Sequence, residues 1–218
     1  MTLAEKAYAS LRHDIVHGRF QPGSPLRLAD LGERYGMGFS PLREALNRLQ
    51  AERLVTAETQ RGFRVAPLSA AEFEDALSAR LVIEGTALRR AIQLGDDAWA
   101  AAIVAALYAL KLQADRPNAD GRELQLRHHA FHRALLAGCG SDWLLEFFER
   151  LYTATERYRI PALLAGGSQK RDINAEHAAV AEAVLARDAD RAEALLRDHY
   201  LRTAEVIRSG MPETLAAS

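Results

Sequence analysis

GMGFSPLREALNRL, residues 36–49, is the stretch of sequence that decides the fold. Ser40 followed by Pro41 predicts a helix start, because a serine side chain can accept hydrogen bonds from the free amides of a first turn and proline loses no donor there. Apolar residues recur at helical spacing and predict the buried face: Leu42, Ala45, Leu46 and Leu49. Arg43 and Asn47 fall on the opposite face, where they can reach phosphates and base edges.

A second amphipathic segment, residues 28–35, precedes this helix and is joined to it by a turn containing Gly36 and Gly38. Helix, glycine turn and helix form the helix-turn-helix arrangement. An ordinary packed pair of helices with solvated arginines would give the same local pattern. Farther upstream, apolar residues recur every fourth position and predict one more amphipathic helix over residues 3–17.

A β-hairpin is predicted after the second of these helices, with strands at 54–57 and 63–66. Arg61 and Gly62 lie at its tip, where a cation and a bare backbone could approach a groove or a phosphate closely. A solvated hairpin tip is the alternative. With the three helices, this hairpin predicts a winged helix-turn-helix domain over residues 1–68.

The ordered set of motifs in this region resembles the winged-helix domain of the GntR family of transcription regulators. The resemblance is carried by GRFQPG at 18–23, Leu28-x-x-Leu31, SPLREAL at 40–46 and GFRV at 62–65. It implies binding to a double-stranded DNA operator. The residues that we expect to contact DNA are Ser40, Arg43, Asn47, Arg48, Arg61 and Gly62.

Phe39 departs from the pattern of that family. Members usually have Ser-Arg-Thr or Ser-Arg-Ser before the proline, and the corresponding triplet here is Gly38-Phe39-Ser40. The arginine that commonly touches DNA is therefore absent, and we expect the operator preference to differ from the usual one.

Charge is distributed unevenly along the 218 residues, whose net charge is −1. Residues 1–68 contain 10 Lys and Arg against 7 Asp and Glu, whereas the remaining 150 residues contain 18 against 22. A mildly basic module beside an acidic one is compatible with specific DNA binding and disfavours strong non-specific binding. Cys139 is the sole cysteine, which excludes an intrachain disulfide and suits a reducing compartment. The first ten residues lack the apolar core of a signal peptide.

The chain changes character at Ser69, which forms a capping-box pattern with Glu72. Residues 69–218 predict about six helices, because the breaks fall at Gly95, 117–120, 138–141, 166–167 and 188–190. The longest uncharged run, 13 residues at 98–110, is too short to span a bilayer. The fold class we expect is therefore mostly α: a winged helix-turn-helix followed by an all-α antiparallel bundle.

Four histidines lie on the apolar stripes of three predicted bundle helices: His128, His132, His177 and His199. Each imidazole brings polar nitrogens that need partners when they are buried. A shared metal ion would satisfy four imidazoles at once. A metal-free polar pocket and a set of unrelated histidines are the two alternatives. His129 is rotated off the inward face.

The same helices resemble the FCD ligand-binding domain, which accompanies this winged helix in the FadR branch of the GntR family. AFHRAL at 130–135, Glu176-His177 and His199 carry the resemblance, which covers residues 69 to about 209. Many members bind a divalent metal through one aspartate and three histidines. The histidines correspond to His132, His177 and His199, while the aspartate is replaced by His128. Four imidazoles favour Zn²⁺, Ni²⁺ or Cu²⁺ over Mg²⁺, Ca²⁺ or Mn²⁺, and we expect Zn or Ni.

Arg80 and Glu84 interrupt the apolar face of the first bundle helix, one turn apart. They either form an ion pair, or Arg80 points into the pocket and stays paired with Glu84 until an anion arrives. The FCD resemblance includes an arginine here. Asn174 and Tyr158 are further candidates for contacts to an effector.

Together these observations predict a transcription regulator whose operator affinity is controlled by a small organic acid bound at a metal-containing pocket, and the resemblance implies a repressor. The resemblance implies a homodimer on a pseudo-palindromic operator in the bacterial cytoplasm, without membrane contact. A metal-responsive regulator without an organic effector is the alternative. A metallo-hydrolase is a further one, although no H-E-x-x-H signature is present and we expect no enzyme activity.

Overall fold

Two compact units make up the chain. The computed structural model describes residues 1–58, 62–117, 120–164 and 171–211, with the backbone alone at 161–164. The first unit comprises the described parts of Met1–Ala76, Tyr152–Gly167 and Val206–Ser218. The second comprises those of Leu77–Leu151 and Ser168–Glu205. Three long helices contribute residues to both units.

Three helices form the N-terminal part of the first unit: α1 (Leu3–Val16), α2 (Leu28–Tyr35) and α3 (Phe39–Ala51). Helix α1 begins at a complete capping box between Thr2 and Glu5. The predicted apolar faces of α1 and α3 pack on one another around Leu11, Leu42 and Leu46, which are fully buried. The helix-turn-helix is thus present, and Gly36 makes its turn in the left-handed conformation that favours glycine.

The start of α3 differs from the prediction. Gly38 is its N-cap residue, and no side chain caps the helix. Phe39 therefore occupies the first turn, so Ser40 lies inside the helix rather than before it. Pro41 still falls in the first turn, where its missing N–H would have no intrahelical acceptor.

A three-stranded antiparallel sheet completes the winged helix, in the order β1-β3-β2. Strands β2 (Val55–Glu58) and β3 (Gly62–Val65) form the predicted hairpin, in which Val55 pairs with Val65. Strand β1 (Pro25–Leu26) pairs with β3 and was not predicted, because two residues are too few to show a periodicity. The tip at 59–61, including Arg61, lies outside the described residues.

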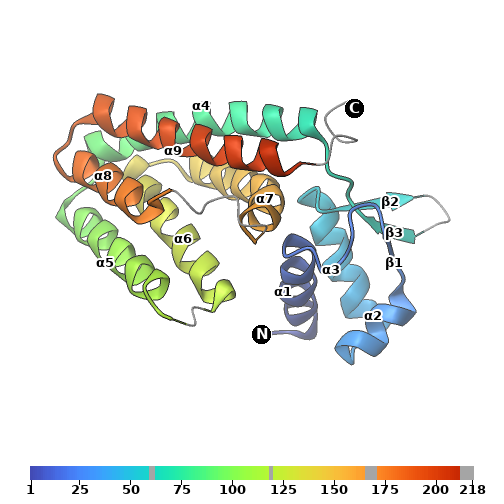
Figure 1. Ribbon diagram of the computed structural model, residues 1–218. Coiled ribbons are helices and arrows are strands. Elements are labelled where there is room, and N and C mark those ends of the chain that lie inside the picture. The colour runs from blue at the N-terminus through green and yellow to red at the C-terminus, as the bar shows by residue number, and fades with distance from the viewer. Residues whose placement is uncertain (59–61, 118–119, 165–170, 212–218) are drawn as a thin grey trace. The chain divides into compact units, whose positions relative to one another are not determined.

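The remaining helices are six in the described part of the chain, as the breaks in the sequence predicted: α4 (Ala70–Leu94), α5 (Asp97–Ala114), α6 (Gly121–Leu136), α7 (Asp142–Leu164), α8 (Ile173–Leu185) and α9 (Ala189–Gly210). The mostly helical fold class is therefore confirmed (Figure 1). Aspartate side chains cap the first turns of α5, α6 and α8. None of the helices in the described ranges has the length and apolarity needed to cross a membrane.

Helices α4 and α9 run alongside each other (Figure 1). Arg89 of α4 pairs with Asp190 and Glu193 of α9 within the second unit. Helices α5, α6 and α8 also pack together there. This packing brings the inward stripes of α6, α8 and α9 toward a common interior, which is where the four histidines lie.

The C-terminal half of α7 belongs to the first unit and packs against the winged helix. Ile160 joins the apolar core of α1, α3 and the sheet. Arg157, which is 5% exposed, donates hydrogen bonds to the Pro67 carbonyl at 2.9 Å and to Glu72 at 2.6 Å. Ser69 accepts from the Glu72 amide, but the Glu72 side chain binds Arg157 and Tyr158, so the predicted capping box is only half formed.

Candidate functional site

The outward face of α3 carries the residues expected to contact DNA. Ser40, Arg43, Asn47 and Arg48 are all exposed along it. Arg43 also lines a hollow of about 560 Å³, which extends over β1, the start of α2 and the wing residues Gly62–Arg64. A cation beside a hollow of this size, at the start of an exposed helix, suits a phosphate or a base edge. Gly62 is exposed at φ +83, a backbone conformation that favours glycine.

Two further arginines line the same hollow and were missed in the sequence. Arg27 is exposed at the N-cap of α2, and Arg64 lies on β3. Arg64 donates to the Gly23 carbonyl at 2.7 Å and pairs with Glu58 at 3.1 Å. The alternation of side chains along β3 would have placed Arg64 on this face, whereas no sequence pattern indicates a role for Arg27. Arg48 lies differently, with its guanidinium 4.0 Å from the ring centre of Tyr8.

The second unit brings together the four histidines singled out in the sequence. His128 and His132 come from α6, His177 from α8 and His199 from α9, and one ligand atom from each lies within 4.8 Å of those of the others. His132, His177 and His199 are buried, and His128 is half-buried. The ring centres of His177 and His199 are 4.7 Å apart. The helical spacing therefore predicted a true cluster.

His132 is held from behind by a buried polar chain. Its Nδ1 lies 3.0 Å from the Tyr200 hydroxyl, which donates to Glu84. Burial raises the pKa of Tyr200 well above its usual value, so the phenol keeps its proton for Glu84. The Tyr200 oxygen can then only accept from His132, which places the proton of that imidazole on Nδ1 and a lone pair on Nε2.

Arg80 forms the end of this chain, where it pairs with Glu84 and lies 4.2 Å from the ring centre of Tyr200. Complete burial raises the pKa of Glu84 against the opposing effect of Arg80. The geometry shows the Arg80–Glu84 ion pair, which was one of the two alternatives predicted from the sequence. Whether Arg80 also binds an effector stays a prediction.

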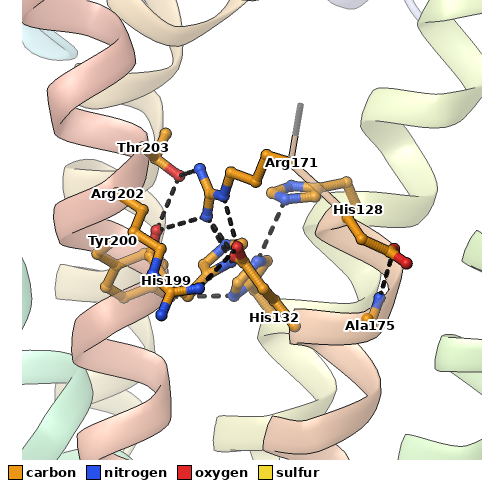
Figure 2. Close-up of polar contacts among 10 residues, drawn as sticks. His128, His132, Arg171, Ala175, His199, Tyr200, Arg202 and Thr203 are labelled. Carbon is orange, nitrogen blue, oxygen red and sulfur yellow. Dashed lines mark hydrogen bonds and ion pairs between the residues drawn. The ribbon is translucent and has the colours of Figure 1, made fainter. Parts of the chain in front are cut away.

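His199 is held by a second polar group (Figure 2). Its Nδ1 lies 2.9 Å from Glu176 Oε2 and 3.2 Å from Arg171 Nη2. Arg171 pairs with Glu176 and also donates to the Thr203 hydroxyl at 2.9 Å. Burial of Glu176 would raise its pKa, but hydrogen bonds from Arg171 and His199 outweigh burial and hold that pKa well below its usual range. Burial lowers the pKa of His199, which favours the neutral imidazole that metals bind.

His128 is arranged differently from the other histidines. Its Nε2 lies 3.2 Å from Nε2 of His132 (Figure 2). Because the His132 proton is on Nδ1, His128 must be the donor in this contact and carries its own proton on Nε2. To bind a metal through Nε2, His128 would have to move that proton to Nδ1. His128 is therefore the histidine that is least prepared to act as a ligand.

The cluster fits a divalent ion after a small contraction. Metal–nitrogen bonds of about 2.1 Å hold ligand nitrogens roughly 3–4.2 Å apart in tetrahedral or octahedral sites. The present spread of 4.8 Å exceeds the largest of these distances, that between opposite ligands of an octahedral site, by about 0.6 Å. Two imidazoles already have Nδ1 engaged by outer groups, which leaves Nε2 of each for an ion.

The other candidate residues lie apart from one another. Asn174 is half-buried in the first turn of α8, three residues before His177. Tyr158 belongs to the first unit, where its hydroxyl bonds to Ser69 and Glu72. His129, expected off the inward face, lies 2.7 Å from Glu149. Glu176 and Arg171 were not predicted as site residues: Glu176 lies outside the apolar stripe of α8, and Arg171 precedes α8 and has no periodicity.

Comparison with known proteins agrees with both halves of this description. Residues 3–65 match the gntR family of bacterial regulatory proteins, and residues 75–202 match the FCD domain. The chain is 42% identical over 209 residues to the HTH-type transcriptional repressor GlaR of Escherichia coli K12, with 94% of this chain and 95% of that protein covered. It is 36% identical over 211 residues to BphR of Paraburkholderia xenovorans LB400, an uncharacterized HTH-type transcriptional regulator, covering 95% and 86%.

A solved structure shares the fold. E. coli McbR/YncC superposes with a TM-score of 0.81 over 96% of this chain and 98% of that one, at 18% identity. The families and relatives matched are transcription regulators rather than enzymes, as predicted. With matches to both domains and a repressor related along almost the whole length, this chain is a transcriptional repressor that belongs to the GntR family and carries an FCD domain.

Proposed function

We propose that the operator affinity of this repressor is controlled by a small organic acid bound at a divalent metal ion, which the four histidines hold in the second unit. The observation that carries the proposal is the convergence of His128, His132, His177 and His199 from three helices, with their ligand atoms within 4.8 Å. Burying four imidazoles together is costly unless they share partners, and a metal ion is the partner that suits all of them.

The donor set favours Zn²⁺ or Ni²⁺, because imidazole suits these ions better than Mg²⁺ or Ca²⁺. When bound, such an ion supplies a positive centre with open coordination positions for a carboxylate. Four neutral imidazoles leave the full charge of the ion in place, which strengthens its attraction for an anion. Arg171 and Arg80 also lie near His199, each paired with a carboxylate, Glu176 and Glu84 respectively.

We also propose that the protein acts as a homodimer on a pseudo-palindromic operator in the cytoplasm. A two-fold axis presents two copies of α3 to two half-sites, which is how helix-turn-helix proteins read such sequences. In each copy, Arg43 and Asn47 would read base edges and Gly62 would approach the backbone.

A metal-responsive regulator without an organic effector is supported by one feature. The hydrogen bond between Nε2 of His128 and Nε2 of His132, 3.2 Å apart, has to be lost when an ion takes both nitrogens as ligands. Metal occupancy would then change the protonation of two α6 side chains without any organic ligand. This candidate predicts that operator affinity follows metal concentration alone.

His177→Ala tests the proposal, with His129→Ala as the matched control on the neighbouring face of the bundle. His177→Ala should lose the metal and the response to effector together, while basal operator binding survives in gel-shift titrations. The effector probe is the small-molecule fraction released from denatured wild-type protein. His129→Ala should lose neither property, because His129 binds Glu149 and lies outside the cluster. Retention of metal and response by His177→Ala would contradict the proposal.

A further inference from the structure

We propose that Glu176 is a positioning residue that selects the metal-binding tautomer of His199, in opposition to Arg171, which favours the tautomer that cannot bind metal. The inference rests on the metal site proposed above and names the groups that prepare one of its ligands. Glu176 and Arg171 lie beyond the histidines and would not touch the ion themselves.

Both groups face the same nitrogen. Nδ1 of His199 lies 2.9 Å from Glu176 Oε2. It also lies 3.2 Å from Arg171 Nη2 (Figure 2). A neutral imidazole carries one N–H and one lone pair, so Nδ1 can serve only one of these partners at a time. A carboxylate can only accept a hydrogen bond, and a guanidinium can only donate one.

The two possibilities have opposite consequences for the metal. If Nδ1 donates its proton to Glu176, the lone pair of His199 resides on Nε2, the remaining nitrogen available for an ion. If Nδ1 instead accepts from Arg171, Nε2 carries the proton and cannot act as a ligand. Metal-ligating histidines commonly have their other nitrogen bound to a carboxylate, which fixes the tautomer and makes the ligand more basic.

The geometry favours Glu176 over Arg171. The Glu176 contact, at 2.9 Å, is shorter than the Arg171 contact, at 3.2 Å, and the Glu176 side chain is only 13% exposed. Arg171 has several other acceptors, which are Glu176 itself, the Thr203 hydroxyl and the His199 carbonyl at 2.9 Å. Arg171 therefore loses little when His199 turns its proton toward Glu176.

Glu176 also supplies a charge that the ligand set lacks. The four imidazoles are neutral ligands. Glu176 places a negative charge one imidazole away from the ion, and Arg202 also pairs with it at 3.3 Å. A carboxylate in this outer position lowers the cost of holding a divalent cation among neutral ligands.

Competition titration of Zn²⁺ against a chromophoric chelator tests the inference on the full-length protein. Glu176→Gln should weaken Zn²⁺ binding by about 10- to 100-fold, the usual effect of losing an outer-shell partner. Arg171→Gln should bind Zn²⁺ at least as tightly as wild type, because it removes a cation and the competing donor. Glu182→Gln, on an exposed pair of the same helix, is the control and should change nothing. Co²⁺ absorption spectra of the same variants report whether His199 still ligates.

The outcomes separate this inference from the proposed metal site. Equal weakening by Glu176→Gln and Arg171→Gln would mean that the pair is only a structural support, and would overturn the inference. Unchanged Zn²⁺ binding by Glu176→Gln would also overturn it, while leaving the metal site standing. Failure of wild type to bind Zn²⁺ would instead overturn the metal site, and this inference with it.

A measurement on the metal-free wild-type protein avoids variants that fail to fold. Long-range ¹H–¹⁵N spectra of the imidazoles distinguish the two neutral tautomers. We expect His199 to carry its proton on Nδ1. A proton on Nε2 would show that Arg171 prevails and would overturn the inference.

Discussion

Arg157→Ala should destabilise the first unit strongly, because this one side chain joins α7 to the end of the winged helix. The guanidinium is 5% exposed and donates to the Pro67 carbonyl at 2.9 Å, to Glu72 at 2.6 Å and to the Tyr158 hydroxyl at 3.0 Å. It also approaches the carbonyls of Arg53 and Ala66. Alanine would remove the guanidinium donor from all these acceptors, and only Glu72 would keep another side-chain donor, the Tyr158 hydroxyl.

The size of the effect follows from the exposure of those partners. Hydrogen bonds to charged groups contribute about 1.5–3 kcal/mol each, so the two shortest contacts suggest about 3–6 kcal/mol. Glu72 is 34% exposed and can recover water when Arg157 is lost. This recovery lowers the expected loss to about 3 kcal/mol, near the lower end for a broken buried ion pair.

Urea denaturation followed by circular dichroism measures this loss, with Arg150→Ala as the matched control. Arg150 lies on the same helix and pairs with Glu146 at 2.7 Å, but its side chain is 64% exposed. Exposed pairs of this kind contribute at most about 0.5 kcal/mol. A loss below about 1 kcal/mol for Arg157→Ala, or equal losses for the two variants, would refute the reasoning.

Three further predictions concern DNA binding and pH. Arg43→Ala should weaken specific operator binding by about 1–3 kcal/mol and relax selectivity at one position, and unchanged affinity in gel-shift titrations would exclude a base contact. Phe39 is 57% exposed, and Phe39→Arg should increase the affinity of the protein for DNA and steepen its salt dependence by about one phosphate. An unchanged salt slope would mean that this position does not face the DNA backbone. Metal-free protein should lose stability as the pH falls below about 6.5, because burial lowers the pKa of His199 in the folded protein and the unfolded chain then binds more protons. Chemical denaturation at several pH values checks this, and stability that stays level down to about pH 5 would contradict it.

The fold was largely predictable because its periodic signals are strong. Leu42, Leu46 and Leu49 identified the buried face of α3, and the glycine, proline and aspartate breaks separated the six later helices. The histidines could be grouped for the same reason, since positions four apart share a helix face. Periodicity therefore predicted both the helices and the histidine cluster.

Features that depend on contacts distant in sequence were not predictable. Strand β1 exists because β3 pairs with it, and its two residues carry no pattern of their own. Arg171 reaches His199 from 28 positions away and from outside any helix. The N-cap of α3 is Gly38 rather than the predicted Ser40, and no side chain caps this helix.

Elemental analysis of the purified protein, after dialysis without chelator, measures its metal content. Together with an assay of DNA release from the operator on the same samples, it tests the central claim most directly. Wild type should carry about one divalent ion per chain and should release DNA when the extracted small-molecule fraction is added. His132→Ala and His177→Ala should carry none and should stay on the operator. Metal-free protein of either variant that still releases DNA in response to that fraction would contradict the account.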